Sequence, residues 1–428
     1  MEVDDTIDLD SGPIRFRDLN EVYNDSYEVE LMDENVEALL VEMEEPTCFR
    51  DAADNLDWVD AMDREMQSIE KNNTWKLDRS LKKLSFRKCF SEQAVYTRGN
   101  GTDVVLLGVY VDDLIVTGGN PENIKLFKQQ MMSEFEMTDL GLLSFYLGIE
   151  VDQKDDHITL KQTCYARKVL GQFGMAECNA SKFPMEPRNK LNADKGGKMV
   201  DATDYRKMIG CLRYLLHTRP DLSYSVGLAS RFMEKPTLLH AGAVKQIMRY
   251  LRGTTEFGLV YVQGGGTGML VGYTDSDHGA DQVERTSTGG MAFYLGENLV
   301  SWCSQKQKTV ALSSCEVEFM AATAAARQAL WLRNLLSKIT EEKPSAVTLY
   351  VDNNSARALM NNPVFHGRSK HIDIKYHFIR QCVERGQIIV KRVSTDEQKA
   401  DALTKALPVG KLVVMRHLLG VRDLGANA

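Results

Sequence analysis

The stretch Met269-Leu-Val-Gly-Tyr-Thr-Asp-Ser-Asp277 decides the fold of the second half of the chain. Its apolar residues alternate, with Val271 and Tyr273 on one face, and this pattern predicts a short strand with an acidic end. Alternation also places Asp275 and Asp277 on the same face. The pattern therefore predicts an acidic corner at the end of the strand. It leaves open which of the two acids is the main functional residue.

Three further acids follow, each on its own predicted element. Glu316 comes after a Ser-Ser pair at the start of a helix, Asp352 closes an apolar strand, and Asp401 lies in a late helix. Carboxylates that converge with Asp275 in a partly desolvated site would repel one another unless divalent cations neutralise them. Their order predicts a metal-dependent phosphodiester site.

Each of these acids also has a structural interpretation. Ser313-Ser-Cys-Glu316 fits a capping box, in which the carboxylate of Glu316 returns to the backbone at the helix start. Asp352 stands at a strand-to-helix junction, where Asp is a common cap, and Asp401 fits a solvated helix position. Only their joint order favours a metal site over these alternatives.

The elements around the acids predict an α/β domain. Three successive strands, then helices that alternate with two more strands, are typical of a mixed sheet flanked by helices. The strands are predicted over 269–275, 288–295, 299–303, 347–352 and 387–393, and the helices over 314–338, 354–361, 371–385 and 396–406.

The composition is that of a soluble globular protein with two or three domains. The chain has 428 residues, of which 43% are hydrophobic and 26% charged. No apolar run reaches the length that spans a bilayer, so we expect no membrane segment and a cytoplasmic or nuclear location. The eight cysteines contain no Cys-x-x-Cys pair, which indicates reduced, buried thiols.

The net charge of -8 is unevenly distributed. Residues 1–45 hold sixteen Asp and Glu against two Arg, a balance of -14, which leaves +6 for the rest. We interpret 1–45 as an acidic, disordered leader, followed by an amphipathic helix over 57–73. The mildly basic remainder permits contact with a phosphate backbone without requiring it.

The first half of the chain carries a second acidic pair. Two apolar runs, 104–111 and 114–117, flank Asp112-Asp113 and predict two strands joined by a tight turn. A structural turn is the plain interpretation, because Asp often forms turns. A helix over 121–135, a strand over 145–151 with its hairpin partner, and further helices follow before Gly264-Gly-Gly266, where we place a domain boundary.

Ordered motifs along the chain resemble the Pol polyprotein of copia-type LTR retrotransposons, in which a reverse transcriptase precedes a ribonuclease H. The hairpin Val109-Tyr-Val-Asp-Asp-Leu114 resembles the polymerase signature of that family. The other matching motifs are Phe135-Glu-Met-Thr-Asp-Leu-Gly141, Tyr205-Arg-Lys-Met-Ile-Gly210, Thr218-Arg-Pro-Asp221, Ala311-Leu-Ser-Ser-Cys-Glu316, Tyr350-Val-Asp-Asn-Asn-Ser-Ala356 and Ala400-Asp-Ala-Leu-Thr-Lys405.

The resemblance divides the chain and exposes a gap. It implies a truncated palm, thumb and connection region over 46–262 and a ribonuclease H-like domain over 267–428. Between the predicted helix at 57–73 and the hairpin, fewer than forty residues stand where the family has a much longer stretch with the first catalytic aspartate. Asp112 and Asp113 are then a remnant polymerase site, and we expect no DNA synthesis.

For the second half, the resemblance implies a complete hydrolase. Asp275, Glu316, Asp352 and Asp401 would be the catalytic residues and would hold two Mg²⁺ ions, with Mn²⁺ as a substitute. The expected nucleic-acid partner is an RNA/DNA hybrid, whose RNA strand is cut to leave a 5′ phosphate. The competing hypothesis is a catalytically inactive remnant that acts at most as a nucleic-acid-binding or interaction module. The sequence does not identify protein partners.

Overall fold

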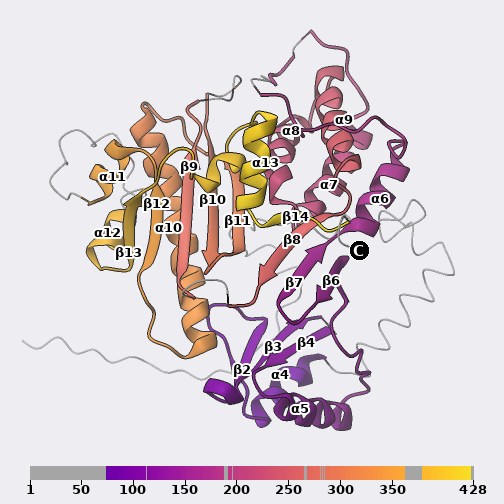
Figure 1. Ribbon diagram of the computed structural model, residues 1–428, viewed down its shortest axis with the longest axis vertical. Helices are drawn as coiled ribbons and strands as arrows, with labels where there is room; N and C mark the ends of the chain where they lie inside the picture. The colour runs from indigo at the N-terminus through magenta and orange to yellow at the C-terminus, as the bar shows by residue number, and fades with distance from the viewer. Residues whose placement is uncertain are drawn as a thin grey trace, which may run out of the picture.

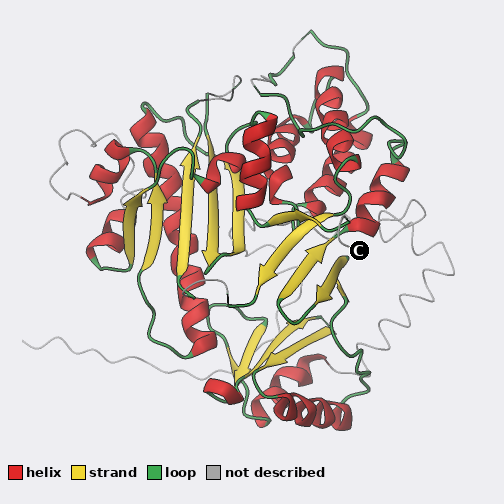
Figure 2. Ribbon diagram, viewed as in Figure 1, coloured by secondary structure: helices red, strands yellow, loops and turns green. Residues whose placement is uncertain are grey.

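The computed structural model describes residues 74–425 apart from 112, 188–190, 195, 265–267, 280, 282, 284 and 362–377. The predicted leader, the predicted helix over 57–73 and Asp112 lie outside the described residues. Figures 1 and 2 show sheets in three places with helices packed around them. The predicted α/β class is confirmed. None of the helices in the described part is both long and apolar enough to cross a membrane.

The second half forms the predicted mixed sheet, with the strand order β11-β10-β9-β12-β13. β9 pairs antiparallel with β10 and parallel with β12, so the acidic end of β9 lies at the same edge as the end of β12. The strands are β9 (Leu270–Ser276), β10 (Thr288–Leu295), β11 (Asn298–Lys306), β12 (Val347–Val351) and β13 (Ile388–Arg392). The described helices on this sheet are α10 (Ser314–Thr340), α11 (Asn354–Asn361) and α12 (Phe378–Glu384).

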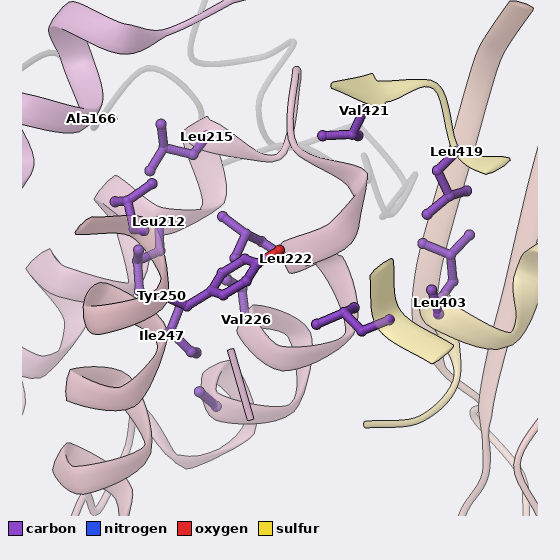
Figure 3. Packing of buried hydrophobic residues seen from close by; sticks show 14 of the residues in the cluster. Ala166, Leu212, Leu215, Leu222, Val226, Ile247, Tyr250, Leu403, Leu419 and Val421 are labelled. Atoms are coloured by element: carbon purple, nitrogen blue, oxygen red, sulfur yellow. The ribbon is translucent and has the colours of Figure 1, made fainter. Parts of the chain in front are cut away.

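The two faces of this sheet belong to different hydrophobic cores. On one face, Phe293 and Leu349 pack with the alanine-rich side of α10, including Ala322 and Ala326. On the other face, Tyr294 belongs to a larger core that extends into the first half of the chain (Figure 3). That core contains, among others, Leu212, Leu222, Val226, Ile247, Tyr250, Leu403, Leu419 and Val421. The two halves are thus joined by apolar packing.

The C-terminal segment returns to the first half of the chain. Helix α13 (Val409–Leu418) is followed by β14 (Val421–Asp423), which pairs antiparallel with β8 (Phe257–Val262). The resulting sheet has the order β14-β8-β7-β6-β5, with β7 (His157–Lys161), β6 (Ile149–Gln153) and β5 (Phe145–Tyr146). The chain after residue 408 thus reaches back across the boundary predicted at 262/267 and pairs with a strand of the first half.

Four helices of the first half contribute to the larger hydrophobic core. They are α6 (Thr163–Gln172), α7 (Ala202–Leu215), α8 (Ser223–Ala229) and α9 (Leu238–Arg252), with the 3-10 turns η3 (Pro220–Leu222) and η4 (Ser230–Phe232). Within them, buried Arg219 donates to both carboxylate oxygens of Asp221 at 2.9 and 2.8 Å and to the carbonyl of Thr254 at 2.7 Å. The motif Thr218-Arg-Pro-Asp221 is thus a fully paired structural element.

The N-terminal described sheet has the order β1-β2-β3-β4. Its strands are β1 (Arg87–Lys88), β2 (Val95–Arg98), β3 (Val105–Tyr110) and β4 (Asp113–Gly118), with α4 (Thr74–Lys83) and α5 (Pro121–Glu134) beside them. The predicted hairpin is confirmed, since Tyr110 pairs with Asp113 across the turn. Val111 in that turn has φ 53°, a left-handed conformation that is unfavourable for a β-branched residue.

Two predicted elements differ from the structure. The strand expected over 145–151 is interrupted between β5 and β6, where Leu147 and Gly148 both have positive φ. The helix expected over 396–406 is only the short 3-10 turn η7 (Lys399–Leu403). This segment packs against β9 and β10, and these contacts, rather than helix propensity, account for the short 3-10 turn in place of a longer helix.

Candidate metal-binding active site

Asp275 occupies the predicted acidic corner at the end of β9. Its side chain is 3% exposed, and one carboxylate oxygen accepts a hydrogen bond from the hydroxyl of Thr404 and lies 3.6 Å from Nζ of Lys405. The neighbouring acid Asp277 has another role, because its Oδ1 accepts from the backbone N of Thr288 at 2.8 Å. The structure thus separates the two acids: Asp275 faces the acidic cluster and Asp277 holds the loop before β10.

Asp401 is brought to Asp275 by the close packing of η7 on the sheet. Gly290 pairs with Asp275 across β9 and β10, and a Cβ atom at Gly290 would lie 2.7 Å from Cγ2 of Thr404 and 2.9 Å from Cβ of Leu403. Gln398 also donates from Nε2 to the carbonyl of Thr274 at 2.9 Å. Only a residue without a side chain at position 290 lets η7 approach this closely.

The acid that α10 contributes to the cluster is Glu318, not Glu316. Glu316 accepts a hydrogen bond from the backbone N of Leu312 at 2.7 Å, and its own N donates to the Ser313 hydroxyl at 3.2 Å. Glu316 therefore takes the capping role that its sequence allowed. Glu318 follows on the buried, alanine-rich side of the helix and is 6% exposed. The capping box was the sequence signal, because it assigns Glu316 to the backbone.

Three carboxylates meet at one point. Ligand atoms of Asp275, Glu318 and Asp352 lie within 4.8 Å of one another. They come from the end of β9, the first turns of α10 and the residue after β12, so each is fixed by a different element of the sheet layer. This is the one group of three or more such side chains among the residues that the structure describes.

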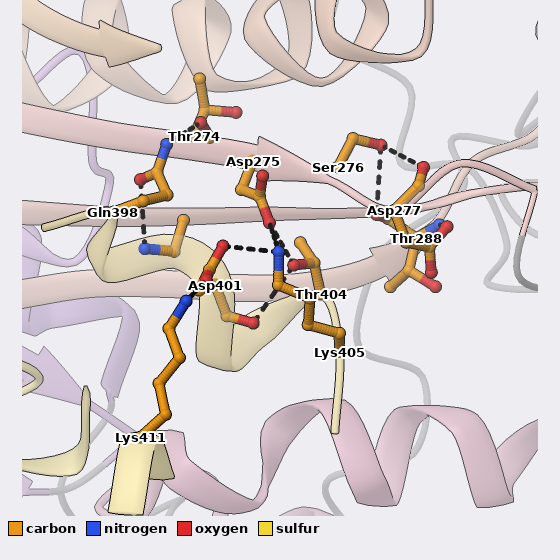
Figure 4. A network of polar contacts seen from close by, with 11 residues as sticks. Thr274, Asp275, Ser276, Asp277, Thr288, Gln398, Asp401, Thr404, Lys405 and Lys411 are labelled. Carbon is orange, nitrogen blue, oxygen red and sulfur yellow. Dashed lines mark hydrogen bonds and ion pairs between the residues drawn. The ribbon is translucent and has the colours of Figure 1, made fainter. Parts of the chain in front are cut away.

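Asp401 lies beside this trio but is already paired. Its carboxylate is fully buried, with Oδ1 2.7 Å from Nζ of Lys405 and Oδ2 bonded to Nζ of Lys411 from α13 (Figure 4). Lys405 lies between Asp275 and Asp401. The predicted set of four thus divides into two acids of the trio, one paired acid and Glu316, which is not in the cluster.

Burial and mutual repulsion make the trio reluctant to ionise without a cation. Burial, followed by the charges of Asp275 and Asp352, raises the pKa of Glu318 to about 9. Burial also raises the pKa of Asp275 to about 6, although Lys405 opposes this shift. The pKa of Asp352 is raised by burial and by the charge of Asp401. A cation among these carboxylates would remove the repulsion.

The trio fits a hard divalent cation. All three groups offer carboxylate oxygens, which Mg²⁺ and Mn²⁺ prefer over nitrogen or sulfur ligands. Glu318 Oε2 is buried and has no hydrogen-bond partner among the described residues, which is costly for a polar atom unless a ligand completes it. The donor set and this orphaned oxygen together support a Mg²⁺ or Mn²⁺ site.

The second acidic pair has a different setting. Asp113 is exposed at the start of β4, and its charge contributes to the raised pKa of Tyr146, for which burial is the main cause. Asp112 lies outside the described residues. Within the described chain, the acids that could hold a metal gather at Asp275 rather than at Asp113.

Sequence comparisons relate the chain to proteins of retroelements. A family model described as reverse transcriptase (RNA-dependent DNA polymerase) matches residues 41–187. The retrovirus-related Pol polyprotein from transposon RE1 of Arabidopsis thaliana is 37% identical over 324 residues, which are 76% of this chain and 22% of that protein. A putative transposon Ty5-1 protein of Saccharomyces cerevisiae is 30% identical over 250 residues, 58% of this chain and 81% of that protein.

Among solved structures, LC11-RNase H1, isolated from compost, matches 32% of this chain and 94% of its own, with 16% identity and a TM-score of 0.24. The sequence matches place the chain in the class of retroelement Pol proteins. Within that class, it belongs to the family of copia-type LTR retrotransposon Pol polyproteins. It spans about a fifth of the length of RE1.

Proposed function

We propose that the second half of this chain is a Mg²⁺-dependent hydrolase for the RNA strand of RNA/DNA hybrids. The observation that carries the proposal is the convergence of Asp275, Glu318 and Asp352 within 4.8 Å, with a buried oxygen of Glu318 left for a ligand. A retroelement Pol protein must dispose of the RNA template once it has been copied, and a phosphodiester hydrolase supplies that step. The family membership and the carboxylate site point to the same chemistry.

The three acids would serve as metal ligands. Bound Mg²⁺ would supply a nucleophile at neutral pH and neutralise charge on the phosphate as it reacts. Asp275 and Asp352 are held at the ends of neighbouring parallel strands, and Glu318 is held by a long helix, so their spacing is fixed before substrate binds. Thr404 orients the Asp275 carboxylate through its hydroxyl.

The substrate assignment rests on the family. A hybrid differs from DNA in the 2′-hydroxyls that line its minor groove, and these groups let a protein select the RNA strand. Metal-assisted hydrolysis of that strand would leave a 5′ phosphate, as the family resemblance implies. Cleavage of single-stranded RNA or of duplex DNA is not part of this proposal.

Hydrolysis of an end-labelled hybrid with Mg²⁺ or Mn²⁺ tests the proposal. Wild type should cut the RNA strand, and Asp352→Asn or Glu318→Gln should lower the rate by at least about 100-fold, since even outer-shell partners of a metal cost 10- to 100-fold. Glu316→Gln is the matched control, and it should keep the rate within about threefold because its partner is the backbone of Leu312. If wild type and both site variants are equally inactive with either metal, the enzyme proposal fails.

One observation favours the competing hypothesis of an inactive remnant. Both oxygens of Asp401 form ion pairs with lysines, so this acid is not free to take a metal in the described conformation. A folded protein that binds hybrid without cutting it would support that hypothesis. The same assay distinguishes the two, provided that hybrid binding is measured in parallel by fluorescence anisotropy.

A further inference from the structure

We infer that Lys405 is a resident cation of the acidic site and that the site therefore takes one divalent ion rather than two. The inference rests on the proposed metal-binding role of Asp275, Glu318 and Asp352. It concerns how many ions these acids and Asp401 hold. It departs from the two ions that the family resemblance implies.

Lys405 stands where a second ion would have to bind. Its Nζ lies 2.7 Å from Oδ1 of Asp401 and 3.6 Å from Oδ2 of Asp275, so one ammonium group bridges the two acids. A second metal ion shared by Asp275 and Asp401 would need the same space and the same oxygens. The ammonium of Lys405 would also repel a divalent cation bound to the same carboxylates.

Lys411 completes the neutralisation of Asp401. Its Nζ is bonded to Oδ2, the oxygen that Lys405 leaves open. Lys411 lies in α13, which contacts η7 and continues into β14 on the neighbouring sheet. The helix that carries this lysine is thus held by the packing between the two halves.

The formal charges agree with a single ion. The four acids Asp275, Glu318, Asp352 and Asp401 carry -4 when ionised, and Lys405 with Lys411 carries +2, which leaves -2. One divalent ion brings this balance to zero, whereas two would leave +2 in a buried site. Buried charge is tolerated when it is paired, so the balanced state is favoured.

The test counts bound ions without measuring catalysis. The full-length chain is titrated with Mn²⁺, and free Mn²⁺ is followed by electron paramagnetic resonance in the absence of nucleic acid. Residues 1–45 hold sixteen acids, which would add weak Mn²⁺ binding to the titration. A triple variant, Asp275→Asn with Glu318→Gln and Asp352→Asn, therefore serves as the blank. After subtraction of the blank, wild type should bind one ion per chain.

Lys405→Met removes the charge and keeps the apolar stem, and we expect it to bind a second ion. Lys405→Arg restores a cation and should bind one ion, as should Lys391→Met, which changes an exposed lysine on β13. Thermal unfolding of each variant shows that it is folded. If Lys405→Met does not fold, the wild-type count and Lys405→Arg still decide the question.

Two ions of similar affinity in wild type would overturn the inference and leave the proposed hydrolase intact. A single unchanged ion in folded Lys405→Met would also overturn it, because something other than Lys405 would then limit the site. No specific ion in wild type, together with no cleavage of hybrid, would remove the proposed function itself. One ion in wild type and two in Lys405→Met would support the inference.

Discussion

Glu316 and Glu318 lie two residues apart in α10, yet their carboxylates have different partners. Glu316 accepts from the backbone of Leu312, whereas Glu318 meets Asp275 and Asp352. A helix turns by 100° per residue, so two residues apart means nearly opposite faces. The N-terminal end of α10 thus uses one glutamate to begin the helix and the other to build the site.

The first prediction concerns the stability of the metal-free protein as a function of pH. The pKa of Glu318 rises from 4.5 to about 9 on folding, so the folded state holds its proton more tightly than the unfolded chain. Stability from this group is therefore complete below about pH 4.5 and is lost as the pH rises towards 9, at up to about 1.4 kcal/mol per pH unit. Urea unfolding in EDTA across this range measures the slope.

Glu318→Gln should flatten that slope: its stability should match wild type below about pH 4.5 and exceed it at pH 7, because the unfolded wild-type chain is ionised at this group there and must take up a proton to fold. Glu316→Gln should keep the wild-type slope. A Glu318→Gln variant with the same slope as wild type would contradict the assignment of the raised pKa.

The second prediction concerns the close packing of η7 on β10. Gly290→Ala places a Cβ atom 2.7 Å from Thr404 and 2.9 Å from Leu403, and it should destabilise the protein by about 1–3 kcal/mol. It should also slow hybrid cleavage, since it would displace Thr404, whose hydroxyl orients the Asp275 carboxylate. Gly289→Ala is the matched control, because its nearest neighbour would be an ordinary 3.6 Å away. Equal stability of the two variants would argue against the packing.

The third prediction concerns the strained turn of the β3–β4 hairpin. Val111 has φ 53°, where a β-branched residue costs about 1–3 kcal/mol. Val111→Gly should therefore be neutral or stabilising in chemical denaturation, although glycine gains entropy in the unfolded chain. Val109→Gly, in β3, should be destabilising, because Val109 packs on the hydrophobic core of the small sheet. Destabilisation by both would show that the turn is not strained.

The fourth prediction concerns the C-terminal return. A chain that ends at Leu407 loses Leu412, Met415, Leu419 and Val421, all buried in the shared core. At about 1.5–3 kcal/mol for each buried side chain, this loss is comparable to the whole stability of a typical domain. We expect aggregation in size-exclusion chromatography and no cooperative melting. A chain that ends at Gly425 should behave like wild type; a monomeric, cooperative chain ending at Leu407 would disprove the role of α13 and β14.

The fifth prediction is that the chain does not synthesise DNA. Asp113 is exposed on the hairpin, and the family resemblance implies that the first catalytic aspartate belongs to a stretch that this sequence lacks. Two-metal phosphoryl transfer needs carboxylates that bridge both ions. Primer extension on an RNA or DNA template with Mg²⁺ or Mn²⁺ should give no product. Template-dependent extension that Asp113→Asn abolishes would refute this expectation.

The sequence alone determined the order of the elements, the α/β class and the family. Periodicity of apolar residues fixed β10 at 288–295 and α11 at 354–361, because period-2 and period-3.6 patterns are local properties of the chain. Local patterns also identified the ends of β9 and β12 as acidic. They indicated a capping role for Glu316, but they did not distinguish that role from metal binding.

Only the tertiary structure decided which acids meet and which charges they meet. Glu318 reaches the site because α10 crosses the sheet end at a particular rotation, and Asp401 meets Lys411 because α13 returns across the sequence boundary. Such contacts join residues far apart in the chain, and no periodic pattern encodes them. The lysines matter most here, since their distance to Asp401, rather than their place in the sequence, determines how many cations the site can hold.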